Sequence, residues 1–367
     1  MNLAILIGHF PPGRFGGAEL QAEAWASRLA KHHRVEVITR RDPATQPSIE
    51  SRDGYRVTRT PVSQVPALRT WLDLRAIDRA VLGLAPRPDL LLCFQTFVSG
   101  LAGVRLQDRL GVPAVVWIRG ELEYRFAAPR ARWFSPFVWS RARAVLVQSE
   151  GTKTALLHEL MGRGRARLAA ALEPKLFVVP NGIELPPPAP RRGGRVLAVG
   201  RLIRDKGMDV VVDAVAGMQG LLTIVGDGPE RARLEAQARH HGLDVRFEGH
   251  VSRERLAELY RESACVVLAA RHGEGLPNVV LEAMAHGRAV VASDVVGSRD
   301  LVRHDENGLL VPPGDALALR DALARLAHER GLADRLGAAG RALAETHAWD
   351  IVEPRLAAVL SAVVTPR

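Results

Sequence analysis

The feature that most constrains this chain is a pair of acids, Glu274 and Glu282, behind an apolar run at 264–269 (ACVVLA). The run is short and rich in β-branched residues, so it predicts a buried strand of a parallel sheet. Pro277 suits the first position of a helix, which Gly287 then ends. The start of such a helix offers unpaired N–H groups to an anion, while Glu274 can accept hydrogen bonds from hydroxyl groups. This combination favours a ligand with both phosphate and hydroxyl groups, such as a sugar attached to a phosphate.

A second element supplies two cations. Residues 196–200 (VLAVG) predict another buried strand, Arg201 follows at its carboxyl end, and Lys206 stands at the start of the next helix. Parallel α/β sheets bind ligands at the carboxyl ends of their strands. Arginine offers a planar fork to phosphate oxygens and lysine a point charge, so the two would neutralise a diphosphate without a metal ion. The sequence holds no H-E-x-x-H or Asp-x-Asp motif, and we expect no essential metal.

Apolar runs alternate with helical patterns along nearly the whole chain. In the first half the expected strands are 3–7, 35–39, 90–93, 114–118 and 144–147, with a helix at 18–30. In the second half strands are expected near 195, 221, 245, 264 and 289–293, followed by helices over 316–364. This alternation predicts an α/β protein with doubly wound parallel sheets. The proline-rich stretch 185–194 breaks every period and predicts a linker between one domain at 1–184 and another at 195–345.

Composition agrees with two cores in a reducing compartment. A chain of 367 residues with 47% hydrophobic residues is long for one core and sufficient for two. Cys93 and Cys265 each lie in an apolar run and are expected to be buried thiols. The start lacks a signal-peptide pattern and no apolar stretch approaches the ~20 residues that cross a bilayer, so we expect a cytoplasmic protein. The net charge of +10 leaves nucleotides, acidic lipid surfaces and nucleic acid open as partners, beside a merely solvated basic surface.

Seven short motifs, taken in order, make the chain similar to the retaining glycosyltransferases of the family four type. They are 16–19 (GGAE), 179–183 (VPNGI), 200–201 (GR), 206–207 (KG), 224–229 (IVGDGP), 274–282 (EGLPNVVLE) and 307–312 (NGLLVP). Each motif is a weak signal, but their joint order and spacing are specific. The resemblance implies a GT-B fold, in which two Rossmann-like domains face each other across a cleft. It also implies that the last helix, here 346–367, packs back on the first domain.

The resemblance assigns glycine-rich turns to the donor, a nucleotide diphosphate sugar. Gly16 and Gly17 would bring backbone close to the diphosphate from the first domain; the other interpretation is a simple turn with positive φ. Gly226 would line the nucleotide pocket. The backbone groups that would contact the base are those of Gly249, His250 and Val251.

For the sugar and its diphosphate, the resemblance assigns the charged residues. Arg201 and Lys206 would stabilise the charge that builds up on the departing diphosphate. Glu274 would orient sugar hydroxyls, and Glu282 would hold the ribose. The loop and helix start that would also contact the donor consist of Gly275, Leu276, Pro277 and Asn278. The implied reaction is a front-face attack in which the leaving phosphate oxygen takes the acceptor's proton, with closure about the linker excluding water.

One residue departs from the family pattern. The family strand that matches 115–118 commonly ends in a histidine close to the sugar, whereas this chain has Arg119. Arginine stays protonated and cannot act as a base. We expect Arg119 to bind a donor or acceptor phosphate, or to contact the sugar through its backbone carbonyl.

The segment 125–143 combines arginines with aromatic residues. The aromatics are Phe126, Trp133, Phe134, Phe137 and Trp139. One interpretation is a partly buried helix whose rings pack within the first domain. The other is an amphipathic patch that lies on an anionic membrane and presents the enzyme to a lipid-linked acceptor. Base stacking on nucleic acid is disfavoured, because the nucleotide-sugar motifs already account for the cleft.

Together these features predict a metal-independent, retaining hexosyltransferase with a nucleotide diphosphate sugar as co-substrate and no bound cofactor. The expected acceptor is a glycan or lipid-linked glycan of cell-surface polysaccharide synthesis, reached from the cytoplasm at the inner face of the membrane. Two alternatives stay open. A nucleotide-sugar epimerase or hydrolase on the same scaffold would consume the donor without an acceptor. A non-catalytic subunit that binds nucleotide or glycan would hold the donor without turnover, and the substitution at Arg119 favours this second alternative.

Overall fold

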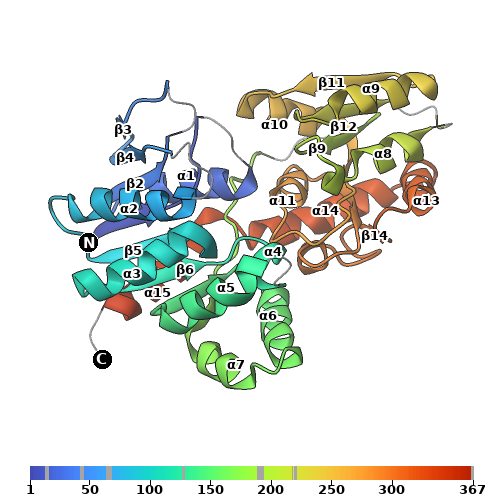
Figure 1. The fold of residues 1–367 in the computed structure, drawn as a ribbon. Coiled ribbons are helices and arrows are strands. Elements are labelled where there is room, and N and C mark those ends of the chain that lie inside the picture. The colour runs from blue at the N-terminus through green and yellow to red at the C-terminus, as the bar shows by residue number, and fades with distance from the viewer. Residues whose placement is uncertain are drawn as a thin grey trace. The chain divides into compact units, whose positions relative to one another are not determined.

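The computed structural model describes residues 1–12, 16–41, 45–62, 68–125, 129–187, 194–216, 218 and 221–364. These residues form two compact units (Figure 1). The first comprises Met1–Pro180 together with the chain from Glu353 onward, and the second comprises Asn181–Val352. Each unit has a mostly parallel sheet covered by helices, so the predicted α/β class with two doubly wound domains is confirmed.

The sheet of the first unit has, among the described residues, eight strands in the order β3-β4-β2-β1-β5-β6-β7-β8. The strands are β1 (Asn2–Leu6), β2 (Arg34–Arg40), β3 (Ile49–Arg52), β4 (Tyr55–Thr60), β5 (Leu90–Phe94), β6 (Ala114–Trp117), β7 (Ala144–Val147) and β8 (Leu176–Val178). Neighbouring strands are parallel except β3 and β4, which form an antiparallel hairpin at one edge. The strands β5, β6 and β7 are buried along their whole length, as their continuous apolar sequences predict.

Helices of the first unit pack on both faces of this sheet. They are α1 (Gly17–Leu29), α2 (Arg69–Leu82), η2 (Thr96–Gly100), α3 (Leu101–Leu110), α4 (Glu121–Tyr124), α5 (Pro129–Arg141), α6 (Glu150–Gly162), α7 (Ala166–Leu172) and η3 (Glu173–Lys175). The helices α3, α5, α6 and α7 share one core with Val116 of β6. Trp25 of α1 packs on Trp117 of β6, with 5.6 Å between ring centroids. Because neighbouring residues of a strand point to opposite faces, α1 covers the other face.

The sheet of the second unit has six parallel strands among the described residues, in the order β11-β10-β9-β12-β13-β14. The strands are β9 (Arg195–Val199), β10 (Leu222–Val225), β11 (Val245–Gly249), β12 (Ser263–Leu268), β13 (Ala289–Ser293) and β14 (Leu309–Val311). Counted within this unit, the order is 3-2-1-4-5-6, which is the order of the dinucleotide-binding Rossmann fold.

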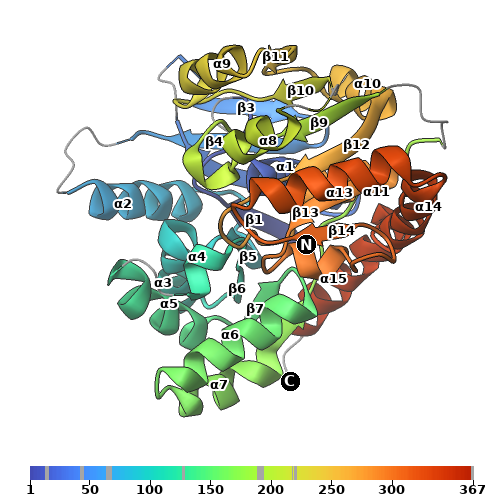
Figure 2. The same cartoon turned by 90° about the vertical axis from the view of Figure 1, so that its right-hand side faces the viewer.

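Two helical layers cover the second sheet. The helices are η4 (Arg204–Lys206), α8 (Met208–Val215), α9 (Arg231–His240), α10 (Arg253–Glu262), α11 (Asn278–Ala285), α12 (Ser298–Leu301), α13 (Ala316–His328) and α14 (Leu332–Glu345). A last helix, α15 (Trp349–Val364), begins in this unit and continues from Glu353 in the first. One core packs α8, α9 and α13 against the sheet, and Figure 2 shows α8 and α13 side by side. A separate core packs α10 and α11 on the opposite face. No helix in the described part of the chain is both long and apolar enough to span a bilayer.

The boundary between the units lies at Pro180 and Asn181, before the stretch predicted as the linker. Residues 181–187 group with the second unit, where the N–H of Ile183 donates to the carbonyl oxygen of His347 at 3.0 Å. The centre of the predicted linker, 188–193, lies outside the described residues. Within the first unit Arg28 donates to Glu353 of α15 at 3.4 Å, so the end of this helix groups with the first sheet.

The start of α11 corrects one local prediction. Pro277 is not the first helical residue but precedes the helix, with an extended ψ of 110°. The side chain of Asn181 donates to the carbonyl oxygen of Leu276 at 3.0 Å and to Oδ1 of Asn278 at 2.6 Å. These bonds hold the backbone before the proline and the side chain of the residue after it. The predicted end of the helix is confirmed, because Gly287 follows with φ of +65°.

Candidate functional site

The candidate site of the second unit lies where the strand order of its sheet reverses. From β9 the sheet grows outward to β10 and β11, and the chain then returns to add β12, β13 and β14 on the other side of β9. At such a switch point the loops leave the carboxyl edge in opposite directions and open a crevice for a ligand. Arg201 and Lys206 follow β9 and Glu274 follows β12, so these three predicted residues flank the switch point.

Lys206 and Glu274 form an ion pair across the switch point. Nζ of Lys206 donates to Oε1 of Glu274, although 68 positions separate the two residues in the sequence. Their side chains are 21% and 23% exposed, so an incoming ligand can reach both. Each charge therefore holds the other in position.

Gly207 explains why the two loops approach so closely. Its φ is +64°, and a Cβ atom placed on it would lie 2.0 Å from the carbonyl oxygen of Ala269, at the end of β12. Only glycine fits this position, both for its φ and for its lack of a side chain. A backbone hydrogen bond of 2.9 Å from Arg271 to Asp205 joins the same two loops. The backbone thus brings Lys206 to Glu274.

Arg201 differs from Lys206 in its surroundings. Its side chain is exposed and makes no hydrogen bond or ion pair with another described residue. The next residue is fixed, because the N–H of Leu202 donates to the carbonyl oxygen of Asp227 at 2.9 Å. An exposed guanidinium close in sequence to a fixed ammonium offers phosphate oxygens a planar fork and a point charge.

The glycines after β10 let three loops pack backbone against backbone. Gly226 has φ of +125°, and a Cβ atom on it would lie 2.0 Å from the carbonyl oxygen of Gly200. A Cβ atom on Gly228 would lie 2.4 Å from the carbonyl oxygen of Leu202. Side chains are therefore excluded beside Arg201, and backbone groups line this part of the carboxyl edge.

The residues predicted to contact the base follow β11. The carbonyl oxygen of Gly249 accepts a 2.8 Å hydrogen bond from the N–H of Gly226. Val251 packs against the core beneath α10 and α11, and the side chain of His250 is exposed. The base contact itself stays a prediction; Gly249 ends β11, the edge strand of the sheet, two strands from β9.

The loop of residues 274–278 is held from two sides. The buried side chain of Asn181 binds its end, as described above, and Leu276 is buried beneath it. A Cβ atom on Gly297, which has φ of +84°, would lie 2.1 Å from the carbonyl oxygen of Gly275. The loop after β13 thus packs directly on this loop. Asn181 belongs to the sequence motif at 179–183, and its role as the anchor of this loop emerges only from these contacts.

Glu282 lies on α11 against a residue that sequence reasoning missed. The hydroxyl of Tyr260 on α10 donates to Oε2 of Glu282 at 2.7 Å, and the ring of His286 stacks on Tyr260 with 5.0 Å between centroids. Burial raises the pKa of Glu282, and the hydrogen bond from Tyr260 opposes that rise. Burial also raises the pKa of Tyr260, which keeps its hydroxyl protonated as a donor. The assigned ribose contact of Glu282 stays a prediction.

In the first unit Gly16 and Gly17 begin α1. Gly16 has φ of −136°, so the interpretation as a turn with positive φ is wrong for this residue. Its N–H donates to Oε2 of Glu19 at 2.8 Å, and the carboxylate thereby caps the helix start. Glu19 acts within its own helix in this structure. The diphosphate contact of the two glycines stays a prediction, and residues 13–15 lie outside the described residues.

Arg119 follows β6, as predicted, but its side chain is 8% exposed. Its guanidinium lies 4.9 Å from the ring centroid of Trp117 and 5.6 Å from that of Phe94. Burial lowers the pKa of Arg119 to about 10, while the nearby charges of Glu123 and Glu19 oppose that shift. The fold therefore places a buried cation close to the start of α1, where the motif of residues 16–19 lies.

Glu123, an acid of α4, completes this group and was not singled out by the sequence. Its carboxylate accepts hydrogen bonds from the backbone N–H of Thr96 at 2.6 Å and of Arg119 at 2.8 Å. It thereby joins the carboxyl ends of β5 and β6. Its only sequence signal is an acid four residues after Arg119 in a short helix.

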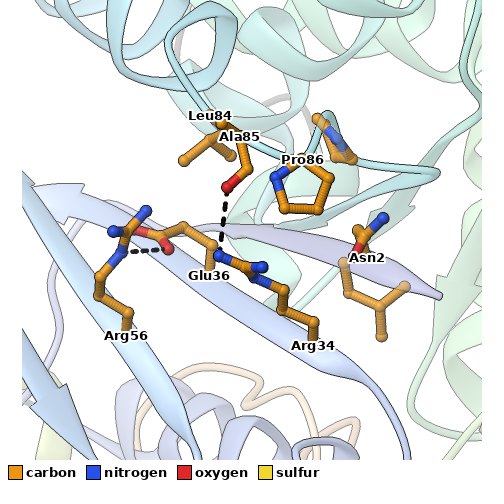
Figure 3. A pocket seen from close by; sticks show the side chains of 9 residues that line it. Asn2, Arg34, Glu36, Arg56, Leu84, Ala85 and Pro86 are labelled. Carbon is orange, nitrogen blue, oxygen red and sulfur yellow. Dashed lines mark hydrogen bonds and ion pairs between the residues drawn. The ribbon is translucent and has the colours of Figure 1, made fainter.

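A small hollow in the first unit lies away from these residues, at the amino ends of β1, β2 and β4 (Figure 3). Its charged side chains bind one another or the backbone: Arg56 donates to Glu36 at 2.6 Å, and Arg34 donates to the carbonyl oxygen of Ala85 at 3.1 Å. Ligands of parallel sheets bind at the opposite, carboxyl edge. We therefore assign no ligand to this hollow.

Two family models match this chain. The glycosyl transferase 4-like domain matches residues 16–182, and the glycosyl transferases group 1 domain matches residues 193–329. A GDP-mannose-dependent alpha-mannosyltransferase of Mycobacterium tuberculosis is 29% identical over 89% of this chain and 86% of its own length.

Other relatives are longer than the matched region. An exopolysaccharide phosphotransferase of Streptomyces coelicolor is 28% identical over 96% of this chain and 40% of its own length. A phosphatidyl-myo-inositol mannosyltransferase of Mycobacterium leprae is 37% identical over 48% of each protein. The matched region thus spans about half, or less, of the length of these two relatives.

Solved structures share the fold. A sucrose-phosphate synthase from Thermosynechococcus elongatus superposes with a TM-score of 0.82 at 22% identity, over 99% of this chain and 98% of the other. An Anabaena protein in complex with UDP-glucose superposes with a TM-score of 0.81 at 21% identity, over 99% of this chain and all of the other (100%).

Proposed function

This chain belongs to the glycosyltransferases of the family four type and has their GT-B fold, and on that premise we propose that it transfers a sugar from a nucleotide diphosphate sugar to an acceptor hydroxyl. The observation that carries the proposal is the Lys206–Glu274 pair at the switch point of the second sheet, with the exposed Arg201 nearby in sequence. This arrangement combines cations for a diphosphate with an acceptor for sugar hydroxyls. The names of the relatives include both GDP-mannose and UDP-glucose, which supports the donor class and leaves the base open.

Donor binding would exchange partners within the ion pair. The diphosphate competes with Glu274 for the ammonium of Lys206, and the sugar hydroxyls then donate to the released carboxylate. Arg201 adds a second cation for the phosphate oxygens. Because Lys206 and Glu274 are already in place before the ligand arrives, little ordering of side chains is needed on binding.

For the chemical step we propose front-face transfer with retention. The bond between the anomeric carbon and the diphosphate oxygen breaks, a bond from the acceptor oxygen to that carbon forms on the same face, and the acceptor's proton passes to the diphosphate oxygen. Lys206 and Arg201 stabilise the negative charge on the departing diphosphate, which makes the proposed step independent of a metal ion. The proposed acceptor is a glycan or lipid-linked glycan of cell-surface polysaccharide synthesis, met at the cytoplasmic face of the membrane.

A donor panel tests the proposal. UDP-, GDP- and ADP-sugars are added to the full chain, and the melting temperature is measured. A true donor at 100 times its Kd stabilises the fold by about 2.7 kcal/mol by mass action. Absence of any shift over the whole panel would overturn the donor class.

Turnover then separates the alternatives. Incubation of the stabilising donor with a panel of glycans and lipid-linked glycans is followed by mass spectrometry. New glycosylated product that depends on the acceptor supports the transferase. Equal donor consumption without an acceptor supports an epimerase or hydrolase, and tight binding without turnover over the panel supports a binding subunit.

A further inference from the structure

The outer face of α5 exposes aromatic side chains. Trp133 is 79% exposed, Phe134 42% and Phe137 44%. Trp133 and Phe137 are one helical turn apart, and Phe134 adjoins them, so the three share one side of the helix. A surface helix ordinarily turns a polar face to water, and a contiguous exposed apolar patch marks an interaction site.

The same helix has a second, buried face. Val138 and Trp139 are fully buried, and Nε1 of Trp139 donates to Oγ1 of Thr96 at 3.0 Å. The interpretation that the aromatics of this segment pack within the first domain is therefore correct for Trp139 and wrong for the three exposed rings. Phe126 lies outside the described residues. Folding of the unit uses one face of α5 and leaves the aromatic face uncovered.

Basic residues surround this aromatic face. Arg165 donates to the carbonyl oxygen of Arg132 at 2.9 Å, and Arg163 donates to that of Arg125 at 3.2 Å. These bonds place the loop after α6 against the amino end of α5, and α7 packs beside α5 (Figure 1). Met161, which is 56% exposed, precedes that loop.

The charge of this region is strongly positive. Residues 125–175 contain ten Lys and Arg but three Asp and Glu, a net of +7 out of +10 for the whole chain. Arg163 is paired with Glu159 within this stretch at 2.6 Å, and Arg125 and Arg141 are paired with Glu121 and Asp108 just outside it. The remaining cations still give this stretch an excess of positive charge.

We propose that the aromatic face of α5, with the loop after α6, docks on a bilayer that contains anionic lipids. The helix would lie in the plane of the interface, with Trp133, Phe134 and Phe137 at the level of the headgroups and acyl chains. The surrounding arginines would contact lipid phosphates, which attract basic segments near the surface. A purely aromatic surface would lack the positive charge and a purely basic surface would lack the apolar contact, whereas this face has both. The inference does not depend on the donor or the reaction.

Charge argues against a second copy of this chain as the occupant. A symmetric dimer through this face would bring two regions of +7 together, which like-charge repulsion opposes. A bilayer with acidic headgroups instead supplies both the apolar layer and the complementary charge. An acidic protein would meet the charge, and an RNA would meet the charge and stack its bases on the rings; both are included as outcomes below.

Intrinsic fluorescence of the full chain provides the first test. Of the six tryptophans, Trp25, Trp117, Trp139 and Trp349 are at most 5% exposed, and Trp71 on α2 is 51% exposed. In a Trp71→Phe variant Trp133 is then the one strongly exposed tryptophan. We expect its emission to shift to the blue with phosphatidylcholine vesicles that contain phosphatidylglycerol, and to be quenched by brominated acyl chains. No shift with these vesicles would overturn the proposal.

Cosedimentation with the same vesicles measures the affinity. The double variant Trp133→Ala/Phe137→Ala should bind at least about tenfold more weakly, because it loses most of the apolar area at the interface. Arg165→Gln should bind about fivefold more weakly, the effect of one charge at an anionic surface. Trp71→Ala is the matched control, an exposed tryptophan of the same unit outside α5, and it should bind as the parent does.

The outcomes are decisive in either direction. Because Trp133 and Phe137 are exposed, the double variant should keep the parent melting temperature, and a folded variant with undiminished binding contradicts the proposal. An equal loss of vesicle binding in the Trp71→Ala control would attribute the binding to exposed apolar area in general and would also contradict the proposal. Two further results would contradict the proposal: binding to RNA but not to anionic vesicles, or size-exclusion chromatography that shows a dimer which the α5 substitutions abolish.

Discussion

Replacement of Tyr260 by phenylalanine tests how the fold holds Glu282. The change removes one hydroxyl, which donates to Oε2 of Glu282 at 2.7 Å. It keeps the ring that stacks on His286, so packing in the core beneath α10 and α11 is preserved. The variant therefore isolates one hydrogen bond to a buried carboxylate.

The expected cost depends on the charge of Glu282. A hydrogen bond to a charged group is worth about 1.5–3 kcal/mol, and one between neutral groups about 0.5–1.5 kcal/mol. Burial raises the pKa of Glu282 from 4.5, the Tyr260 hydrogen bond opposes this, and its removal raises the pKa further. The folded variant then binds the proton of Glu282 more strongly than the unfolded chain does. The stability that this protonation contributes is complete below the unfolded pKa and is lost as pH rises through the raised folded pKa.

The loss of stability should therefore grow with pH. We expect the free energy of unfolding to fall by about 2 kcal/mol near pH 8 and by about 1 kcal/mol near pH 5. Urea unfolding at both pH values, followed by circular dichroism, measures the difference. Tyr55→Phe is the matched control, because Tyr55 is also buried and its hydroxyl interacts with Arg52, which stays charged throughout this range. A loss in Tyr260→Phe that is the same at both pH values would refute the reasoning.

Three further substitutions test the site. Lys206→Ala should reduce the rate of sugar transfer by about 10²–10³-fold. It should change the free energy of unfolding by less than about 1 kcal/mol, because the ion pair with Glu274 is partly exposed. Normal turnover in this variant would remove the role assigned to Lys206. Asn181→Ala should lower the free energy of unfolding, measured by chemical denaturation, by about 1–3 kcal/mol, because the carbonyl oxygen of Leu276 loses its hydrogen bond. The KM for the nucleotide sugar should rise as well. An unchanged KM would show that the loop does not need this anchor. Gly226→Ala should lower the free energy of unfolding by more than about 2 kcal/mol, because the added Cβ atom would meet the carbonyl oxygen of Gly200. Gly242→Ala is the control, with φ of +66° but open space around it, and should cost about 1–2 kcal/mol. Equal losses in the two variants would contradict the close packing of Gly226 on Gly200.

The strands of both sheets were predictable because burial on two faces imposes continuous apolar runs. The expected runs at 90–93 and 144–147 match β5 and β7 within one residue. The β3–β4 hairpin was missed because β3 alternates exposed and half-buried residues and β4 begins by alternating buried and half-buried ones, so neither carries such a run. The turn at Asp53 and Gly54 is a hairpin signal that could have revealed it.

The candidate site was predictable only in part. The sequence pointed to Lys206 and Glu274 through their places after apolar strands, but it could not show that they pair, since that contact spans 68 positions. Tyr260 carries no motif, and its importance arises from one hydroxyl that points at Glu282. Asn181 lies in the motif at 179–183, but the motif does not show that its side chain is buried and binds the loop before α11.

By itself the sequence determined the family, the two α/β units and the kinds of residue at the strand ends, because these follow from hydrophobic periodicity and local turn chemistry. The tertiary structure alone decided which charges meet, which acids are buried and which face of α5 stays uncovered. Each of these depends on how elements distant in the chain pack together. Such packing fixes the positions of the side chains, and no local pattern of residues encodes it.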